Sequence, residues 1–237
     1  MSIAFDDISA FAFSLLAVLL VFEYLRPPPI VILTAKVPLS LLFCYVALTS
    51  ATFPSENVYV AYRTCILYGL LCGLAGDVAL AFIHSDRLFL VGLVVFLAGH
   101  VMYVFAFAFL CVSSAGDFAF VWKEEPLMNS AVMGVLSLIL YLVLMEHFGP
   151  MRLPCLAYIV VITLMVAAAN YLYFDSSYKR EGREMALYGA VLFFISDLFV
   201  ACEKFVYHSF LNRLLNLPTY YAAQFLIAYS ISSLFAH

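Results

Sequence analysis

Two apolar segments of the chain each carry a single carboxylate. Residues 68–77 read Tyr-Gly, seven further residues and Asp, and residues 188–197 repeat this skeleton with every shared position displaced by 120. A carboxylate at the centre of a membrane-spanning helix costs about 2.5 to 3.5 kcal/mol on insertion scales. Because two such costs at matched places indicate a shared role, the sequence predicts that Asp77 and Asp197 form one site.

Such a pair of carboxyl groups is suited to acid–base catalysis. Like charges close together in a medium of low dielectric cannot both ionise, so one carboxyl keeps its proton while the other is a carboxylate. The pair would titrate as a unit. We therefore expect one of Asp77 and Asp197 to act as a general acid and the other to stabilise positive charge and direct water. The sequence leaves open which is which.

Other polar side chains inside apolar segments are candidates to orient the carboxylates or to hold a substrate. His100 is the one histidine well inside an expected span, and it shares a helical face with Phe96 and Tyr103. It is expected to be either a partner of an aspartate or a hydrogen-bonded core residue. Tyr220 can also be explained as part of an interfacial aromatic belt. The candidates beside the two aspartates are Lys36, His100, Tyr103, Ser196, Tyr220, Tyr221 and Gln224.

Two features of the expected second and third helices have a plain and a functional interpretation. The long side chain of Lys36 either carries its ammonium toward the interface or is held near the acids or a lipid phosphate. Gly69, Gly73 and Gly76 lie at i, i+4 and i+7, which leaves one helical face bare. This face permits either close helix packing or the approach of a thin ligand.

The composition is that of an integral membrane protein. Of the 237 residues, 66% are hydrophobic and 11% are charged, whereas about 25% are charged in a typical soluble domain. Runs of alternating polarity, as in a membrane barrel, are missing, and the sequence predicts an all-α, polytopic membrane protein of eight transmembrane helices. The expected spans are residues 8–24, 30–49, 62–84, 88–112, 126–146, 153–174, 184–206 and 216–235.

These helices are expected to form a single membrane domain, residues 1–237, built from two parallel four-helix repeats. The first half covers about 1–112 and the second about 126–237, with a polar loop between them. The last helix is expected to begin after Pro218, a favourable first-turn residue. The net charge of −4 and the absence of a long basic run indicate no nucleic-acid partner.

Alternation of helix direction predicts where the polar residues lie. If the N-terminus is on side A, then Asp77 and Asp197 lie in the half of the bilayer nearer the opposite side, B, together with Lys36 and the polar start of the last helix. The polar candidates should therefore converge on one cavity that opens toward side B. The orientation stays undecided, because the loops of each side carry five Lys or Arg residues.

The arrangement of these residues resembles the YhhN-like lysoplasmalogenase family of transmembrane enzymes, and the resemblance covers most of the chain. It is carried by several blocks that occur in the same order. These blocks are Gly76-Asp77, Gly92-Leu93 with Phe96, His100 and Tyr103, Gly189-Ala190 with the run from Phe193 to Leu198, Lys204-Phe205, and the run from Thr219 to Gln224.

The resemblance implies a hydrolase that cleaves the vinyl ether of 1-alkenyl glycerophosphocholine or glycerophosphoethanolamine, releasing a fatty aldehyde, without a metal or organic cofactor. It also implies residence in the endoplasmic reticulum membrane. A vinyl ether reacts by protonation at its β-carbon, and the oxocarbenium ion that results is captured by water. Asp77 and Asp197 would supply the acid and the carboxylate, and Lys36 would meet the phosphate. Oligomeric state and headgroup preference stay open.

Other classes of protein also place carboxylates in a membrane. A proton- or ion-coupled transporter keeps them at matched places in repeated halves, but it would need polar residues toward both sides. A non-catalytic sensor of ether lipids would bind without turnover. An intramembrane aspartyl protease would have Gly where Leu74 stands and Tyr where Ser196 stands. A zinc hydrolase needs about three ligands around an open position, and one interior histidine argues against it.

Overall fold

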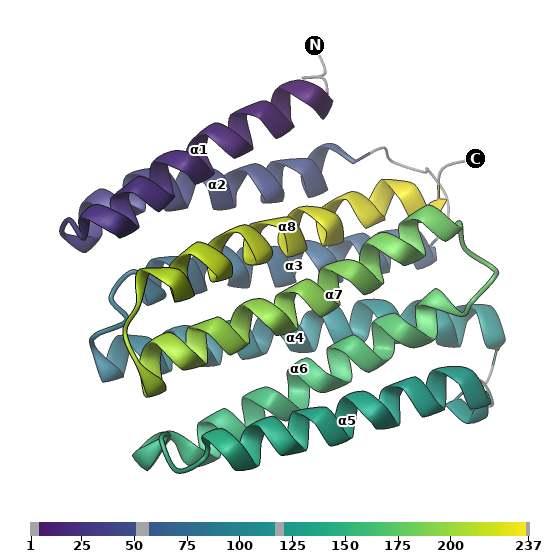
Figure 1. Ribbon diagram of the computed structural model, residues 1–237. Helices are drawn as coiled ribbons and strands as arrows, with labels where there is room; N and C mark the ends of the chain where they lie inside the picture. Colours follow the sequence, from purple (N-terminus) through teal and green to yellow (C-terminus); the bar gives the residue numbers. More distant parts are fainter. Residues whose placement is uncertain (1–4, 51–56, 117–120, 236–237) are drawn as a thin grey trace.

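The computed structural model describes residues 5–50, 57–116 and 121–235 and consists almost entirely of helices (Figure 1). The all-α prediction is confirmed. Residues 117–120, in the loop between the predicted halves, lie outside the described residues. The α-helices are α1 (Phe5–Leu25), α2 (Pro29–Thr49), α3 (Asn57–Leu80), α4 (Asp86–Ala115), α5 (Glu124–Leu144), α6 (Arg152–Tyr173), α7 (Arg180–Ala201) and α8 (Phe210–Phe235), with a 3-10 turn, η2 (Gly149–Met151), before α6 and a π-helix, η3 (Cys202–Val206), after α7.

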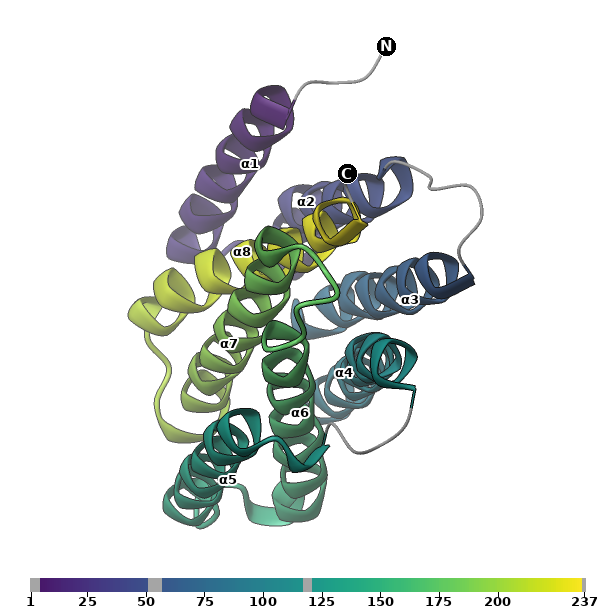
Figure 2. The same ribbon diagram turned by 90° about the vertical axis from the view of Figure 1, so that its right-hand side faces the viewer.

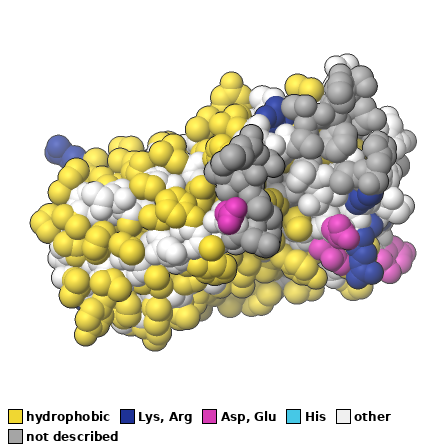
Figure 3. Space-filling view, turned by 90° about the horizontal axis from the view of Figure 1, so that it is seen from above, with side chains coloured by type: hydrophobic (Ala, Val, Ile, Leu, Met, Phe, Trp, Pro, Cys, Tyr) yellow, Lys and Arg dark blue, Asp and Glu magenta, His cyan; other side chains and the backbone are white. Residues whose placement is uncertain are grey.

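Seven of the eight helices are long and apolar enough to span a membrane, and α8 is the exception. The flank seen in Figure 3 is mostly hydrophobic, and most of the charged side chains visible on it lie near one end. The chain is therefore a multi-pass membrane protein. Helix α8 is less apolar because it packs among α1, α2, α3 and α7 and turns polar side chains inward. Its buried polar residues are Asn212, Asn216, Gln224 and Ser230.

Helix α8 also starts earlier than the sequence suggested. We expected Pro218 to lie in its first turn, but the helix begins at Phe210 and Pro218 lies inside it. A proline in a helix interior removes one backbone hydrogen bond, which neighbouring helices and side chains can compensate in a membrane bundle. The two additional turns bring the start of α8 level with the end of α7.

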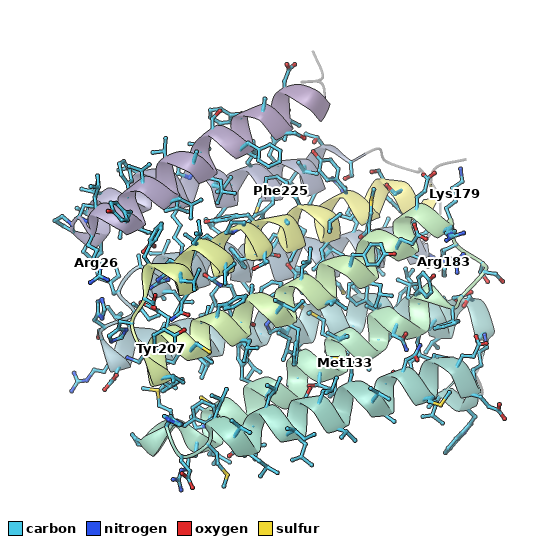
Figure 4. All side chains as sticks on the ribbon, in the orientation of Figure 1. Arg26, Met133, Lys179, Arg183, Tyr207 and Phe225 are labelled. Atoms are coloured by element: carbon cyan, nitrogen blue, oxygen red, sulfur yellow. The ribbon has the colours of Figure 1, made fainter. Side chains whose placement is uncertain are left out.

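Consecutive helices run antiparallel (Figure 1), so their connections alternate between two ends of the bundle. The connections α1–α2, α3–α4, α5–α6 and α7–α8 lie at end B, whereas α1 begins and α8 ends at end A. Arg26 and Tyr207 mark end B in Figure 4, and Lys179 and Arg183 mark end A. Because α3 and α7 both run from A to B, Asp77 and Asp197 lie toward end B.

The centre of the bundle is formed by two helix pairs that occupy equivalent places in the two predicted halves. Helix α3 packs most extensively against α4, and α7 packs most extensively against α8. Helices α1 and α5 lie at the periphery (Figure 2) and bury little of their surface. The four central helices carry most of the buried polar residues, to which α2 adds Lys36 and Ser40, whereas α1 and α5 present mainly apolar side chains to the surroundings.

Close packing explains the bare face of α3. Each of its three glycines is covered by a side chain from α4 or α8, so side chains of the protein itself fill the space that a thin ligand could have used. A Cβ would overlap Tyr103 if placed on Gly69, Gln224 if placed on Gly73, and Phe96 if placed on Gly76.

A substitution in α7 tests how strictly the central pair is packed. A Cβ on Gly182 would overlap the backbone of Leu234 in α8, and overpacking of this kind costs about 1 to 3 kcal/mol. We expect Gly182→Ala to lower the thermal unfolding temperature in detergent. Gly134→Ala in α5 is the control, because nothing lies within 4 Å of its Cβ position. Equal melting temperatures for the two variants would contradict the close approach of α7 and α8.

Candidate active site

Asp77 is buried and fully engaged by groups from α2 and α8. Its Oδ1 lies 3.2 Å from Lys36 Nζ. Its Oδ2 accepts hydrogen bonds from Ser40 Oγ at 2.6 Å and from the Tyr220 hydroxyl at 2.8 Å. Asp77 is 2% exposed and Lys36 is 3% exposed. The carboxylate is thus fixed by one cation and two hydroxyl donors, away from solvent.

A chain of hydrogen bonds extends this arrangement along α8. The Tyr103 hydroxyl donates to Gln224 Oε1 at 2.7 Å, and Gln224 Nε2 donates to the Tyr220 hydroxyl at 3.1 Å. The Tyr221 hydroxyl lies 3.4 Å from Ser40 Oγ. We call this network the inner cluster. It consists of Lys36, Ser40, Asp77, Tyr103, Tyr220, Tyr221 and Gln224.

Asp197 belongs to a second set of polar side chains from α4 and α6. The Tyr158 hydroxyl donates to Asp197 Oδ2 at 2.6 Å. His100 Nε2 lies 2.8 Å from the Tyr158 hydroxyl and 3.4 Å from the same Oδ2. Among the described residues none donates to Oδ1 of Asp197, and 19% of the side chain is exposed. We call His100, Tyr158 and Asp197 the pocket cluster.

The hydrogen bonds of the pocket cluster define the tautomer of its histidine. Because Tyr158 gives its one proton to Asp197, its oxygen accepts from His100 Nε2. The proton of a neutral imidazole then resides on Nε2, so Nδ1 is an acceptor. This Nδ1 atom is buried and has no partner within the described part of the chain. A free acceptor in a buried polar cluster is where an ordered water is expected.

Aromatic rings lie between the two clusters, which also touch where the rings of His100 and Tyr103 pack 6.4 Å apart between centroids. The ring of Phe193 packs against His100 at 4.6 Å and against Tyr220 at 5.3 Å between centroids. Phe96 packs against both Phe193 and Tyr220. Over the described residues no side chain bonds to both Asp77 and Asp197. The polar residues converge toward end B, but they form two clusters instead of the single cavity that we expected.

A pocket opens beside the second cluster. It holds about 790 Å³ of empty space with its mouth included, and its walls come from α3 to α7 and η3. Asp197 and Tyr158 line it, whereas no member of the inner cluster does. The other lining residues are mainly aliphatic and aromatic, as in sites that enclose an apolar ligand. The arrangement places one carboxylate, with one free oxygen, against an apolar pocket.

The remaining predicted candidates lie in different places. Lys36 does not extend toward the interface but is held near Asp77. Its ammonium also donates to the Asp77 carbonyl at 3.3 Å. Ser196 is buried and donates to the Phe193 carbonyl at 2.9 Å, so it contacts neither carboxylate. Throughout residues 5–50, 57–116 and 121–235, no three His, Cys, Asp or Glu side chains gather as a metal site would require.

Two residues of these clusters, Ser40 and Tyr158, were not among the residues predicted from the sequence. Ser40 lies one helical turn after Lys36, so the i, i+4 spacing placed it on the same face. Tyr158 lies two turns into a helix that starts at end B, at the depth where Lys36 and Tyr220 also lie. Alternation of helix direction, applied to α6 as it was to α2 and α8, would have found it.

Comparison with known proteins adds an independent observation. The sequence model of the YhhN family matches residues 30–231. Lysoplasmalogenase TMEM86B of Rattus norvegicus is 32% identical over 171 residues, which cover 70% of this chain and 61% of the rat protein. The chain thus aligns with less than two thirds of the length of this relative. No solved structure gives a significant match.

Proposed function

Because the chain belongs to the YhhN family, we propose that it is a lysoplasmalogenase. It would hydrolyse the vinyl ether of 1-alkenyl glycerophosphocholine or glycerophosphoethanolamine to a fatty aldehyde and the glycerophospho-alcohol. The observation that carries this proposal is the apolar pocket with Asp197 in its wall. The pocket suits the alkenyl chain, and the name of the rat relative supports this reaction.

In this proposal Asp197 is the general acid. A vinyl ether resists nucleophiles, so the reaction must begin with transfer of a proton to the β-carbon. Tyr158 occupies Oδ2 of Asp197 as a donor, whereas Oδ1 is free and can carry the proton. Transfer from Oδ1 forms a C–H bond and converts the alkene and ether oxygen into an oxocarbenium ion beside the new carboxylate. This carboxylate stabilises the cation because the two charges lie close together in an apolar site.

The same carboxylate can complete the hydrolysis. Water adds to the oxocarbenium carbon, and its proton passes to Asp197, which restores the acid. The hemiacetal then loses the glycerol oxygen as an alcohol, and a carbonyl forms in the aldehyde. A change of role from acid to base within one reaction is established for other carboxyl groups in hydrolases.

Asp77 has a positioning role in this proposal. It is paired with Lys36 and lies outside the pocket lining. Its bond to Tyr220 fixes an aromatic ring that packs against Phe193, and Phe193 packs against His100. The inner cluster would therefore hold the pocket cluster in place by packing. The alternative is that Asp77 takes part directly in the reaction, as in a two-aspartate mechanism. Variants at Asp77 and Lys36 distinguish this role from a positioning role.

Tyr158 tests the arrangement around the acid. We expect Tyr158→Phe to lower kcat about 10- to 100-fold, because a hydrogen bond to a charged group contributes about 1.5 to 3 kcal/mol. KM should change little, since the ring stays in the pocket. Tyr62→Phe is the control, because it removes another buried hydroxyl bond, to Ser230 at 2.7 Å, outside both clusters. A rise in KM with kcat unchanged would show that Tyr158 only binds substrate.

The membrane architecture completes the proposal. We propose that α8 spans the bilayer as the eighth helix, and that the halves are two parallel repeats. The equivalent packing of α3 with α4 and of α7 with α8 supports the repeats. The endoplasmic reticulum is our proposed location on family resemblance, and a fluorescent fusion imaged beside a resident marker tests it.

The reaction itself is tested with purified protein in detergent and D₂O. The substrates are 1-alkenyl glycerophosphoethanolamine and its saturated 1-alkyl analogue. We expect aldehyde from the vinyl ether alone, with one deuterium on the carbon next to the carbonyl, because protonation at that carbon begins the reaction. Mass spectrometry reads both results. Folded wild-type protein that releases no aldehyde would overturn the proposed function.

A further inference from the structure

A partly buried cation lies behind the wall of the pocket near end B. Lys204 belongs to the π-helix η3, and its ammonium donates to the Ile83 carbonyl at 2.9 Å and to Asp86 Oδ1 at 2.7 Å. It also lies 5.0 Å from the centre of the Phe89 ring. Phe89 and Phe205 both line the pocket. The positive charge therefore stands directly behind two aromatic residues of the pocket wall.

The surroundings of this ammonium leave room for an anionic ligand. An ammonium has three donors, and described residues occupy two of them. The lysine side chain is 9% exposed, whereas its partner Asp86 is 77% exposed. An exposed carboxylate holds an ion pair weakly, because water competes for it. Asp86 can thus turn away while Lys204 stays in place.

The spacing of Asp197 and Lys204 along α7 and η3 suits a phospholipid. Asp197 and Lys204 are seven residues apart on continuous helix, which corresponds to about 10 Å along the axis. The glycerol backbone that links a vinyl ether to a phosphate, extended by the reach of a lysine side chain, can bridge this span. Lys36 is excluded from this role because it is 3% exposed and its ammonium is held by the buried carboxylate of Asp77.

We propose that Lys204 binds the phosphate of the lysophospholipid, with Asp86 as the anion that occupies its ammonium when no substrate is present. This inference rests on the proposed function, which places the vinyl ether at Asp197. The phosphate displaces the Asp86 carboxylate, so Asp86 acts as a competitor of substrate.

The test compares two substrates that differ in the phosphate. They are 1-alkenyl glycerophosphoethanolamine and 1-alkenyl glycerol, assayed in detergent micelles free of other phospholipid. We expect Lys204→Gln to raise KM for the phosphorylated substrate about 10-fold, the effect of losing one charge-assisted bond, and to leave KM for 1-alkenyl glycerol unchanged. Lys204→Arg should recover much of the affinity, and Asp86→Asn should lower KM for the phosphorylated substrate alone. Lys179→Gln, at end A, is the control.

The outcomes separate this inference from the proposed function. If the wild type cleaves both substrates and Lys204→Gln changes KM equally for both, or for neither, Lys204 does not bind the phosphate. If the difference appears only after phosphatidylethanolamine is added to the micelles, the phosphate belongs to a bilayer lipid and the substrate assignment is wrong. If the wild type cleaves neither substrate, the proposed function itself fails and this inference fails with it.

Discussion

Asp197→Asn should abolish turnover while the protein stays folded. The amide is the same size as the carboxyl and can still accept the Tyr158 hydroxyl at its oxygen, so the packing is preserved. It cannot deliver a proton to the β-carbon, and loss of general acid catalysis typically costs a factor of about 100 to 10,000. We expect kcat for the vinyl ether to fall by at least the lower value. Aldehyde release from single time courses, measured beside thermal unfolding in detergent, checks both parts.

The control for this variant is Asp7→Asn, near the start of α1 and far from both clusters. It should retain wild-type kcat and melting temperature. Turnover by Asp197→Asn at the wild-type rate would remove Asp197 from the chemistry and return the role of acid to Asp77. Loss of the folded state would instead show that Asp197 has mainly a structural role.

Asp77→Asn should act chiefly on stability. The substitution leaves the ammonium of Lys36 buried without a counter-charge, and breaking one partner of a buried ion pair costs about 3 to 5 kcal/mol. We expect a lower melting temperature and poor recovery in detergent. A matched surface pair, Arg180 with Glu184 at 2.7 Å, provides the control, and Arg180→Gln should leave the melting temperature nearly unchanged. A melting temperature of Asp77→Asn equal to the wild type would contradict the structural role of the pair.

A double variant decides whether Asp77 also takes part in the reaction. Replacing a whole buried ion pair by apolar residues of similar size is often neutral or stabilising, so Lys36→Met with Asp77→Leu should regain most of the lost stability. If this variant is stable and cleaves the vinyl ether, Asp77 supports the site by position alone. If it is stable and inactive whereas Tyr220→Phe, which also breaks the bond between Asp77 and Tyr220, stays active, the two-aspartate mechanism is correct and our assignment of a single acid is wrong.

The sequence predicted the elements of this fold better than it predicted the contacts between them. Hydrophobic segments of the right length are a local property, so the helices and their alternating directions followed from the chain alone. Depth along a helix is also local, and it placed Asp77, Asp197 and Lys36 toward end B. Rotation of each helix about its axis depends on its neighbours. The separation of the two aspartates by Phe193, and the contact of Lys36 with Asp77, could therefore not be deduced.

The glycines of α3 show the same limit in another way. Their spacing indicated a bare face, but it could not identify the group that covers that face. The side chains that cover it, Tyr103, Gln224 and Phe96, lie far from α3 in the sequence. Their contact with α3 depends on how α4 and α8 pack against it. Tyr158 differs from these residues, because its depth along α6 already indicated a place toward end B.

Each of the two aspartates has one polar partner that comes from the other half of the chain. Asp77 in the first half receives Tyr220 from the second half, and Asp197 in the second half is close to His100 from the first. Tyr220 and His100 occupy matched places, 120 residues apart, as the aspartates do. Each half therefore supplies one polar partner to the carboxylate of the other half, in addition to the partners that each carboxylate has within its own half. Separated four-helix fragments would each leave one polar partner of a carboxylate unsatisfied until the two fragments associate.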